Sequence, residues 1–311
     1  MKRTLVIAVL TITSAWLRVD PLFAQGFGKF SEWSEPVNLG QPVNSEFDDL
    51  HTAISTDGLR LYFVSNRPEG FGGEDIWISQ RASLKDPWGE PRNLGSTINT
   101  EYNEFAPNLS PDGHWMYFAS GRPGGCGGAD LWGSWREDPA DDFGWEPPVN
   151  LGCIVNSAEH EAGPFYYEDN EQGTITLYFA SSRLGGFDIY ASTLGEDGSW
   201  NPAVLVEELS TPQSDSGPDI RPDGLELFFH SNRPGSLGGR LDLWVSTRQT
   251  TLDAWSTPVN LGPKLNTEHI EHGSSLTFDA TTLYFDSDRP DGVGGRDIYV
   301  TTRKKMGRQE R

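Results

Sequence analysis

The chain has 311 residues, of which 12% are aromatic, with 35 glycines, 21 prolines and a formal net charge of −21 at pH 7. This length allows one large all-β domain or two ordinary domains, and the many glycines and prolines favour short strands and tight turns over helices. The negative charge argues against binding to nucleic-acid phosphates or anionic membrane surfaces, and towards cations, cationic partners or solubility.

The first 24 residues have the pattern of a secretory signal peptide. Lys2 and Arg3 precede an apolar run over residues 5–17, and Ala24 offers a small residue for cleavage before Gln25. The run is too short, and too soon interrupted by charged residues, to span a membrane stably, and a retained anchor is the alternative. No cysteine follows the run, so lipid attachment is not expected. We predict an exported monomer, periplasmic or secreted, with a signal peptide at 1–24, a mature domain at 25–305 and a tail at 306–311.

A repeated motif organises the rest of the chain. Residues 65–77 read S-N-R-P-E-G-F-G-G-E-D-I-W, and related segments begin at four more serines, Ser120, Ser181, Ser231 and Ser287. The aspartates near the end of each copy are 55, 58, 54 and 55 residues apart: Asp75, Asp130, Asp188, Asp242 and Asp297. Between the copies lie five tryptophans, four of which begin W-x-x-P-x-N-L-G: Trp33, Trp88, Trp145, Trp200 and Trp255. Such a period must be explained before any other feature.

Each period contains four expected strands. Residues 60–65 alternate and are rich in aromatics, and segments 115–120, 176–181, 226–231 and 282–287 match them. Asp-Gly turns precede three of these segments, where glycine supplies the positive φ of a hairpin. A further strand precedes each turn (105–110 in the second period), D-I-W-I-S follows the glycine loop, and P-x-N-L-G makes the fourth strand.

Four antiparallel strands per period are typical of a β-propeller blade, so we predict an all-β, five-bladed propeller. The chain begins with a fourth strand (33–40) and ends with a third strand (297–301). The N-terminal strand should therefore complete the last blade and hide sheet edges that would otherwise invite aggregation. A linear solenoid or two sandwiches is the alternative.

At the residues Ser-x-Arg-Pro, Asp-Ile-Tyr/Trp and Ser-Pro-Asp-Gly, the chain resembles the TolB-type, WD-like propeller repeats of exported bacterial proteins. The resemblance covers essentially the whole mature chain. The G-G-x-D-I-Y form looks like the five-bladed version in envelope proteins that also carry an OmpA-type peptidoglycan-binding domain, which these 311 residues lack. The resemblance implies a binding or scaffolding role, although such a motif specifies fold better than function.

Propeller topology places the glycine loops and the crossovers between blades on one face, here called the glycine-loop face, and the Asp-Gly turns on the opposite hairpin face. Just before each innermost strand every period has an acid, and these five acids are predicted to ring the channel mouth as catalytic candidates: Asp49, Glu104, Glu161, Asp215 and Glu271. The motif arginines could neutralise them through bidentate pairs: Arg67, Arg122, Arg183, Arg233 and Arg289. In the structural alternative, which we favour, these residues stabilise the fold. Each blade then repeats one Arg–carboxylate pair that holds its glycine loop, here called a clasp, and the closing Asp caps loop amides.

Positions at which one blade departs from the others are better candidates for binding. When the five repeats are aligned, most equivalent positions beside the acids and at the end of the second strand hold small or apolar residues. In one or two blades a His or an acid replaces them. Because blades 4, 5 and 1 are consecutive around the ring, most of these residues should converge at one side of the channel mouth. The ligand-binding candidates are Asp48, His51, His160, His230, His272 and Asp286.

Two kinds of chemistry could use this cluster. His51, His272 and Glu271 could bind a divalent metal such as calcium or zinc and activate a water. Alternatively, paired carboxylates could cleave a glycosidic bond. No H-x-x-x-H or other tight ligand spacing occurs, and a lone loop histidine is more often only solvated or hydrogen-bonded.

Blade 3 has a shorter glycine loop, with only five residues from Arg183 to Asp188, which should lower the rim there. Cys126 lies in the second glycine loop and Cys153 just past the fourth strand of the same blade, on the same face. We predict a disulfide between them, since such bonds persist in exported proteins.

Together these features predict an exported propeller that binds a ligand or a cell-envelope partner, protein or glycan, at its acidic face. The alternatives are a glycan-acting hydrolase and a metal-dependent hydrolase such as a lactonase.

Overall fold

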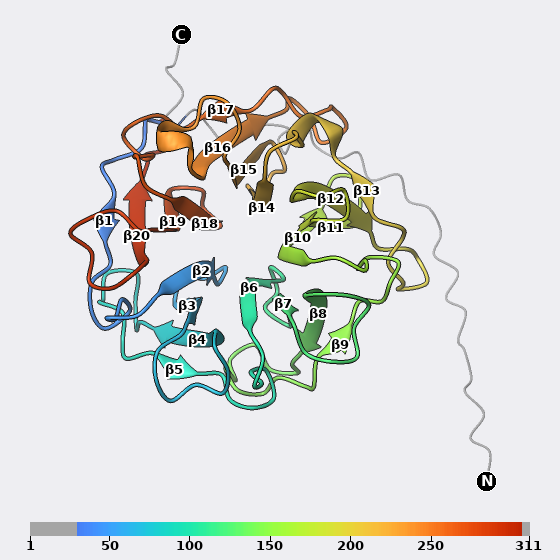
Figure 1. Cartoon of the computed structure of the whole chain (residues 1–311), viewed down its shortest axis with the longest axis horizontal. Coiled ribbons are helices and arrows are strands. Elements are labelled where there is room, and N and C mark those ends of the chain that lie inside the picture. The colour runs from blue at the N-terminus through green and yellow to red at the C-terminus, as the bar shows by residue number, and fades with distance from the viewer. Residues whose placement is uncertain (1–29, 307–311) are drawn as a thin grey trace, which may run out of the picture.

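The structure, a computed structural model, describes residues 30–306, so the predicted signal peptide and all but the first residue of the predicted tail lie outside it. Five four-stranded antiparallel sheets are arranged around a common axis as the blades of a propeller (Figure 1). This confirms the predicted all-β, five-bladed fold. Within residues 30–306, no helix has the length and apolar character needed to cross a membrane.

The blades follow the chain in order, with the innermost strand first. Blade 1 contains β2 (Asp49–Ile54), β3 (Arg60–Ser65), β4 (Asp75–Gln80) and β5 (Arg92–Asn93). Blade 2 contains β6 (Glu104–Leu109), β7 (Trp115–Ser120), β8 (Asp130–Trp135) and β9 (Val149–Asn150). Blade 3 contains β10 (Glu161–Asp169), β11 (Thr174–Ser181), β12 (Asp188–Thr193) and β13 (Val204–Leu205). Blade 4 contains β14 (Asp215–Ile220), β15 (Glu226–Ser231), β16 (Asp242–Thr247) and β17 (Val259–Asn260). Blade 5 contains β18 (Glu271–Leu276), β19 (Thr282–Ser287), β20 (Asp297–Thr302) and, from the start of the chain, β1 (Val37–Asn38).

The ring closes as predicted, because β1 pairs antiparallel with β20, Val37 opposite Val300 and Asn38 opposite Tyr299. The outer strands are much shorter than expected: β1 has two residues where residues 33–40 were predicted. Pro36 cannot donate to the ladder and Gly40 has a positive φ of 65°, so regular pairing ends on both sides of the pair.

Blade 3 departs from the other blades in its inner hairpin. β10 has nine residues and β11 eight, whereas the matching strands elsewhere have six. The core lies between neighbouring blades and includes one fully buried phenylalanine from each second strand: Phe63, Phe118, Phe179, Phe229 and Phe285. Burying each such ring contributes roughly 2 kcal/mol.

Every innermost strand contains a β-bulge just after its second residue. The bulged residues all have positive φ, between 47° and 63°: His51, Ala106, Gly163, Gly217 and Gly273. They also approach one another across blades, since a Cβ on Gly163 would lie 3.0 Å from Gly217 Cα and one on Gly273 would lie 3.1 Å from His51 Cα. These bulges therefore bring the blades together around the axis.

Candidate functional site

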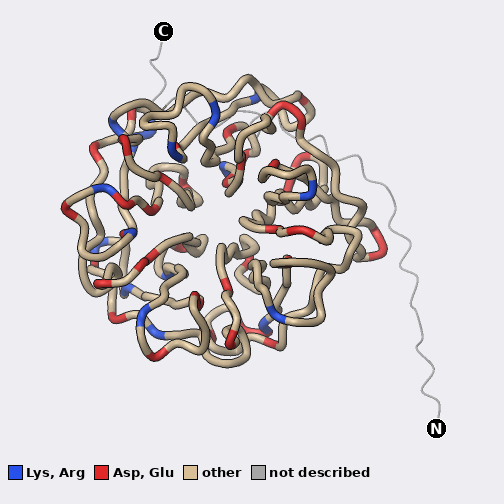
Figure 2. The backbone as a smooth tube through the Cα atoms, in the orientation of Figure 1, with Lys and Arg blue, Asp and Glu red and all other residues tan. Residues whose placement is uncertain are grey.

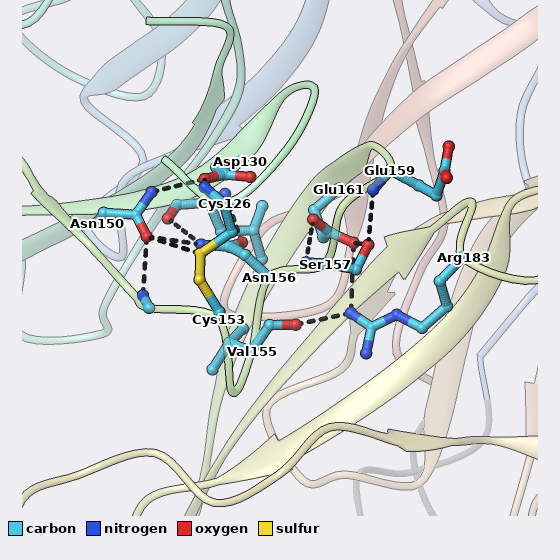
Figure 3. Close-up of a disulfide and its surroundings, with 12 residues drawn as sticks. Cys126, Asp130, Asn150, Cys153, Val155, Asn156, Ser157, Glu159, Glu161 and Arg183 are labelled. Atoms are coloured by element: carbon cyan, nitrogen blue, oxygen red, sulfur yellow. Dashed lines mark hydrogen bonds and ion pairs between the residues drawn. A yellow bond between two sulfur atoms is a disulfide. The ribbon is translucent and has the colours of Figure 1, made fainter. Parts of the chain in front are cut away.

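The five predicted catalytic acids are fully buried in clasps. In blade 3, Arg183 Nη2 donates to Glu161 Oε1 (3.3 Å) and to the Val155 carbonyl (2.6 Å), as Figure 3 shows. Glu161 also accepts from the amide and hydroxyl of Ser157 (2.9 and 2.5 Å). Equivalent pairs occur in every blade: Arg67–Asp49, Arg122–Glu104, Arg233–Asp215 and Arg289–Glu271.

These contacts fit the structural alternative rather than a ring of reactive acids. Each carboxylate has an exposed fraction of 0%, so none presents an oxygen to the channel. The expected bidentate geometry is also corrected: each arginine divides its donors among the carboxylate, a backbone carbonyl and a serine, as Arg67 does with Asp49, Val43 and Ser65. Burial raises the pKa of Asp49 and of Glu271, and donors that include the paired arginine partly offset the rise.

The closing aspartates cap loop amides in four blades. In blade 1, Asp75 Oδ2 accepts from the Phe71 amide (2.5 Å) and from the Asn93 side chain (3.0 Å). Blade 3 is the exception. Its short loop brings no amide of the described residues to Asp188, and Leu205 occupies the fourth-strand position that corresponds to Asn93 of blade 1.

Two of the predicted ligand-binding residues serve the blade-to-blade contact. Asp48 Oδ1 accepts from the Arg296 amide (2.9 Å) and His160 Nδ1 from the Ala129 amide (3.0 Å). Asn103 does the same for the Glu74 amide (3.2 Å). All three satisfy the amide just before the closing Asp of the preceding blade, and His160 therefore lies away from the other histidines.

The other four candidates converge as predicted. The His272 ring centroid lies 4.4 Å from that of His51 and 4.0 Å from that of His230. His272 Nδ1 is 3.2 Å from Asp286 Oδ1, and the His51 amide donates to the same oxygen (3.0 Å). Arg296 Nη1 lies 3.6 Å from Asp286 Oδ2. We call these five residues the axial cluster.

Burial divides the axial cluster into neutral and charged groups. Burial lowers the pKa of His51 and His230 well below the usual range, and the neighbouring His272 lowers both further. Burial alone would raise the pKa of Asp286, but His272 and Arg296 outweigh it and hold the pKa below its ordinary value. A fixed negative charge therefore lies behind the His272 imidazole.

Glycines on the bulges make room for this arrangement. A Cβ on Gly217 would lie 2.5 Å from His230 Cε1, and one on Gly273 would lie 2.4 Å from Asp286 Oδ1. Both contacts are shorter than a real Cβ allows. The His230 and Asp286 side chains can therefore occupy these places only because residues 217 and 273 are glycines.

Two members of the channel mouth, Glu74 and Arg296, were not predicted from the sequence. They occupy the same place in blades 1 and 5, directly before the closing Asp, where the other blades have Ala129, Phe187 and Leu241. Burial raises the pKa of Glu74; Arg296 and His272 oppose this, and Asp48 and Asp286 add to it. The five-copy alignment contained this signal, because one column holds an acid, an arginine and three apolar residues.

The structure does not assemble the predicted metal site. In the part of the chain it describes, no group of three or more His, Cys, Asp or Glu side chains is arranged to hold a metal ion. Glu271, the proposed third ligand beside His51 and His272, instead bonds to Thr267 and Arg289.

The predicted disulfide joins Cys126 and Cys153, 27 residues apart in the sequence (Figure 3). The Cys126 amide also donates to Asp130, so the blade 2 glycine loop is fixed both by the closing Asp and by the disulfide.

A further buried acid, outside the Arg–carboxylate pairs and the axial cluster, lies below the bulges. Asp219 is 3% exposed, accepts from the Leu276 amide (2.6 Å), and borders a cavity of about 150 Å³ on the hairpin side. Burial raises its pKa to about 7. Asn108 holds the equivalent place in blade 2 and accepts from the Tyr166 amide (2.9 Å), so a polar bridge between blades is the shared role.

No family model matches this chain, and no curated protein matches it. Among solved structures, an α-L-arabinofuranosidase from Podospora anserina in complex with cellotriose matches with a TM-score of 0.58 and 12% identity, over 88% of this chain and 97% of that chain. An endo-arabinase from Bacteroides thetaiotaomicron VPI-5482 matches with a TM-score of 0.56 and 16% identity, over 86% and 97%. A xylan β-1,4-xylosidase from Bacillus halodurans C-125 matches with a TM-score of 0.54 and 16% identity, over 84% and 53%.

The resemblance to TolB-type envelope propellers is therefore wrong, because the solved structures reported above are glycoside hydrolases, and further matches include proteins described as GH62 and GH43. The motif behind that resemblance encodes the Arg–carboxylate clasp and the Asp cap, which build a blade whatever the protein does. At identities of 12–16%, the solved structures establish one point about this chain, that it has the fold of these five-bladed propellers.

Proposed function

We propose that the chain is a glycan-acting hydrolase whose reaction takes place at the channel mouth on the glycine-loop face. The observation that carries the proposal is that two partly exposed carboxylates, Glu74 and Asp48, lie near enough there for the charge of Asp48 to raise the pKa of Glu74. Glycosidases use two carboxylic groups, one protonated and one ionised, and environments that separate their pKa values assign the roles.

Glu74 is suited to donate a proton to the leaving oxygen. Burial raises its pKa, and the charges of Asp48 and Asp286 raise it further against Arg296 and His272. A raised pKa keeps a larger fraction of the carboxyl protonated near neutral pH, as a general acid requires.

Asp48 is suited to act as the second carboxylate, either as a base for water or as a nucleophile. One oxygen accepts from the Arg296 amide (2.9 Å) and the other from the Asn66 side chain (3.3 Å), which fixes the group while leaving it partly exposed. The anomer released first, observed by NMR, distinguishes the two roles.

The axial cluster supports this pair. The ionised Asp286 contributes negative charge where an oxocarbenium-like transition state becomes positive. With Nδ1 turned to Asp286, His272 has Nε2 available for a sugar hydroxyl. The binding role predicted for a ring of acids has less support, because those acids are enclosed in clasps.

Pentose-containing glycans are the proposed substrates, since the matching structures are described as arabinofuranosidases, an endo-arabinase and a xylosidase. The test is hydrolysis of nitrophenyl α-L-arabinofuranoside and β-D-xyloside, and of arabinan and xylan oligosaccharides. Glu74→Gln and Asp48→Asn should each reduce kcat about 100-fold or more. Glu46→Gln, an exposed acid of the same crossover, should not.

Asp48→Asn is a suitable variant because Asn103, at the equivalent position before blade 2, already accepts from the equivalent amide, that of Glu74. A protein that binds these oligosaccharides but hydrolyses none of them would contradict the proposal and favour a binding protein.

A further inference from the structure

Four of the five blades cover their outer tryptophan with an arginine. The arginine follows the third strand, and its guanidinium carbon lies 4.2–4.5 Å from the ring centroid: Arg81 over Trp88, Arg136 over Trp145, Arg248 over Trp255 and Arg303 over Trp33. Each arginine also donates Nε to a carbonyl of its own hairpin turn, at 2.6–2.9 Å. The chain therefore builds the same cation–aromatic pair four times.

The same guanidinium fills the junction with the preceding blade. Arg136 Nη1 of blade 2 donates to the Tyr62 hydroxyl of blade 1 (3.2 Å). Arg303 of blade 5 lies over Phe228 of blade 4 (5.7 Å to the centroid). Arg81 and Arg248 likewise bond to Tyr284 of blade 5 and Tyr178 of blade 3. At four junctions, therefore, a cation contacts aromatic rings of two neighbouring blades.

Blade 3 lacks this arginine. Leu194 occupies its place, and no guanidinium of the described residues lies over Trp200. A groove of about 480 Å³ opens at this junction, here called the blade 2–3 groove, lined by Trp115, Tyr117, Gly133, Ile154, Leu194 and Trp200. This volume is within the range of small-molecule sites.

Gly133 enlarges the groove from the blade 2 side. The matching residue of the third strand is Ile78, Ala191, Val245 or Val300 in the other blades. A Cβ on Gly133 would lie 3.2 Å from the Tyr117 ring, so the glycine lets this ring lie against the strand. Two departures from the repeat, a missing arginine and a missing side chain, therefore coincide at one junction.

The walls of the groove favour a cation. Trp115 stacks on Tyr117 (centroids 5.9 Å apart) and Tyr117 on Tyr166 (5.5 Å), while Trp200 meets Tyr117 edge-on (6.2 Å). Asp112 does not line the groove, but its negative charge reaches the aromatic wall, since burial and then Asp112 raise the pKa of the Tyr117 hydroxyl. Trp115 is 38% exposed, so this aromatic wall is reachable from solvent.

We propose that the blade 2–3 groove binds a small organic cation with a guanidinium group, which takes the place of the arginine present at the other four junctions. The guanidinium stacks on Trp200 and Trp115, and the Tyr117 hydroxyl and the carboxylate of Asp112 favour it electrostatically. This site lies at a blade junction and does not depend on hydrolysis at the channel mouth.

The test compares ethylguanidinium with ethylurea, a neutral compound of the same shape, by calorimetry on the full chain at low-millimolar concentrations. Ethylguanidinium should bind saturably and at least about tenfold more tightly than ethylurea, the factor expected from one cation–aromatic contact of roughly 1.4 kcal/mol. NMR of the indole N–H groups should show the largest shift at Trp200.

Leu194→Arg places a guanidinium of the protein itself over Trp200, as in the other four blades. It should abolish the binding of ethylguanidinium while preserving the fold. Trp200→Leu should weaken binding about tenfold. The reciprocal variant Arg248→Leu should create a second site, visible as a shift of the Trp255 indole signal with ethylguanidinium.

Equal binding of ethylguanidinium and ethylurea would overturn the proposal, and so would binding that Leu194→Arg leaves intact. Xylotriose that shifts the Trp200 signal where ethylguanidinium does not would also overturn it, because the groove would then be a sugar site. None of these readouts involves hydrolysis, so the outcome is separate from that of the proposed function.

Discussion

His272 Nδ1 lies 3.2 Å from Asp286 Oδ1, and the two residues are cross-strand partners in β18 and β19. Blades 1 to 3 have only apolar residues at the matching pairs, such as Leu50 and Val64 in blade 1. Blade 5 therefore places a histidine–carboxylate pair where those blades have apolar core residues. Burial lowers the pKa values of the neighbouring His230 and His51, which favours their neutral forms. Such buried polar groups usually reflect function.

The two neutral histidines should make the protein sensitive to acid. Because burial lowers their pKa values, the unfolded state binds more protons than the folded state below pH about 6.5, and stability falls as the pH falls. His230→Leu should reduce this slope by up to about 1.4 kcal/mol per pH unit in urea unfolding between pH 7 and pH 5. An unchanged slope would show that His230 titrates in the folded protein as it does when unfolded.

Asp219 should act in the opposite direction. Its pKa is raised to about 7, so the protonated carboxyl contributes fully to the free energy of unfolding at low pH. This contribution is lost as the pH rises through about 7. Asp219→Asn should therefore stabilise the protein at pH 8 by a few kcal/mol and have little effect at pH 4. Asn can still accept from the Leu276 amide, as Asn108 does from Tyr166 in blade 2.

The reciprocal change Asn108→Asp is the control for this effect. It should create the same loss of stability at high pH, measured by urea unfolding. If neither variant alters the pH dependence, Asp219 is solvated in the folded protein.

Substituting a clasp arginine should reduce the free energy of unfolding more than substituting an arginine of a surface ion pair. Arg233→Ala leaves the fully buried Asp215 without its cation and should cost about 3 kcal/mol or more of unfolding free energy. Arg240→Ala removes an exposed ion pair with Asp288 (3.3 Å) and should cost less than about 1 kcal/mol. Equal costs would mean that the clasp is no stronger than a surface pair.

Removing the disulfide tests its place in the blade 2 rim. Cys126→Ser with Cys153→Ser opens a loop closed by residues 27 apart, and the chain-entropy relation gives a cost of about 3.5 kcal/mol. The measurement is thermal unfolding of the variant beside the oxidised wild type. Two free thiols in protein purified from an oxidising compartment would contradict the pairing.

The repeat allowed the fold to be predicted, because each copy contains its own clasp, turn and strand pattern. Second strands at 60–65 and 226–231 were placed to the residue. The fourth strands were overestimated, since Pro36 and Gly40 limit pairing to two residues in β1. Negative charge proved a poor guide to the site: Asp and Glu lie around the whole ring (Figure 2), and the conspicuous acids are buried by arginines.

The candidate site was predictable only in part. Columns in which blades differ identified His51, His230, His272 and Asp286, which the structure brings together. Glu74 and Arg296 were missed, although their column has the same kind of signal. Which of these groups remains partly exposed depends on contacts between blades, and the sequence of one blade does not contain them.

Leaving-group dependence tests the proton-donor role of Glu74 most directly. A general acid matters when the leaving group is a poor one, such as a sugar alcohol, and hardly at all for dinitrophenolate. With Glu74→Ala, kcat/KM should therefore fall about 100-fold or more for oligosaccharides and only a few-fold for the dinitrophenyl glycoside of the same sugar. Equal losses on both substrates, or no loss on either, would contradict the assignment of Glu74 as the acid.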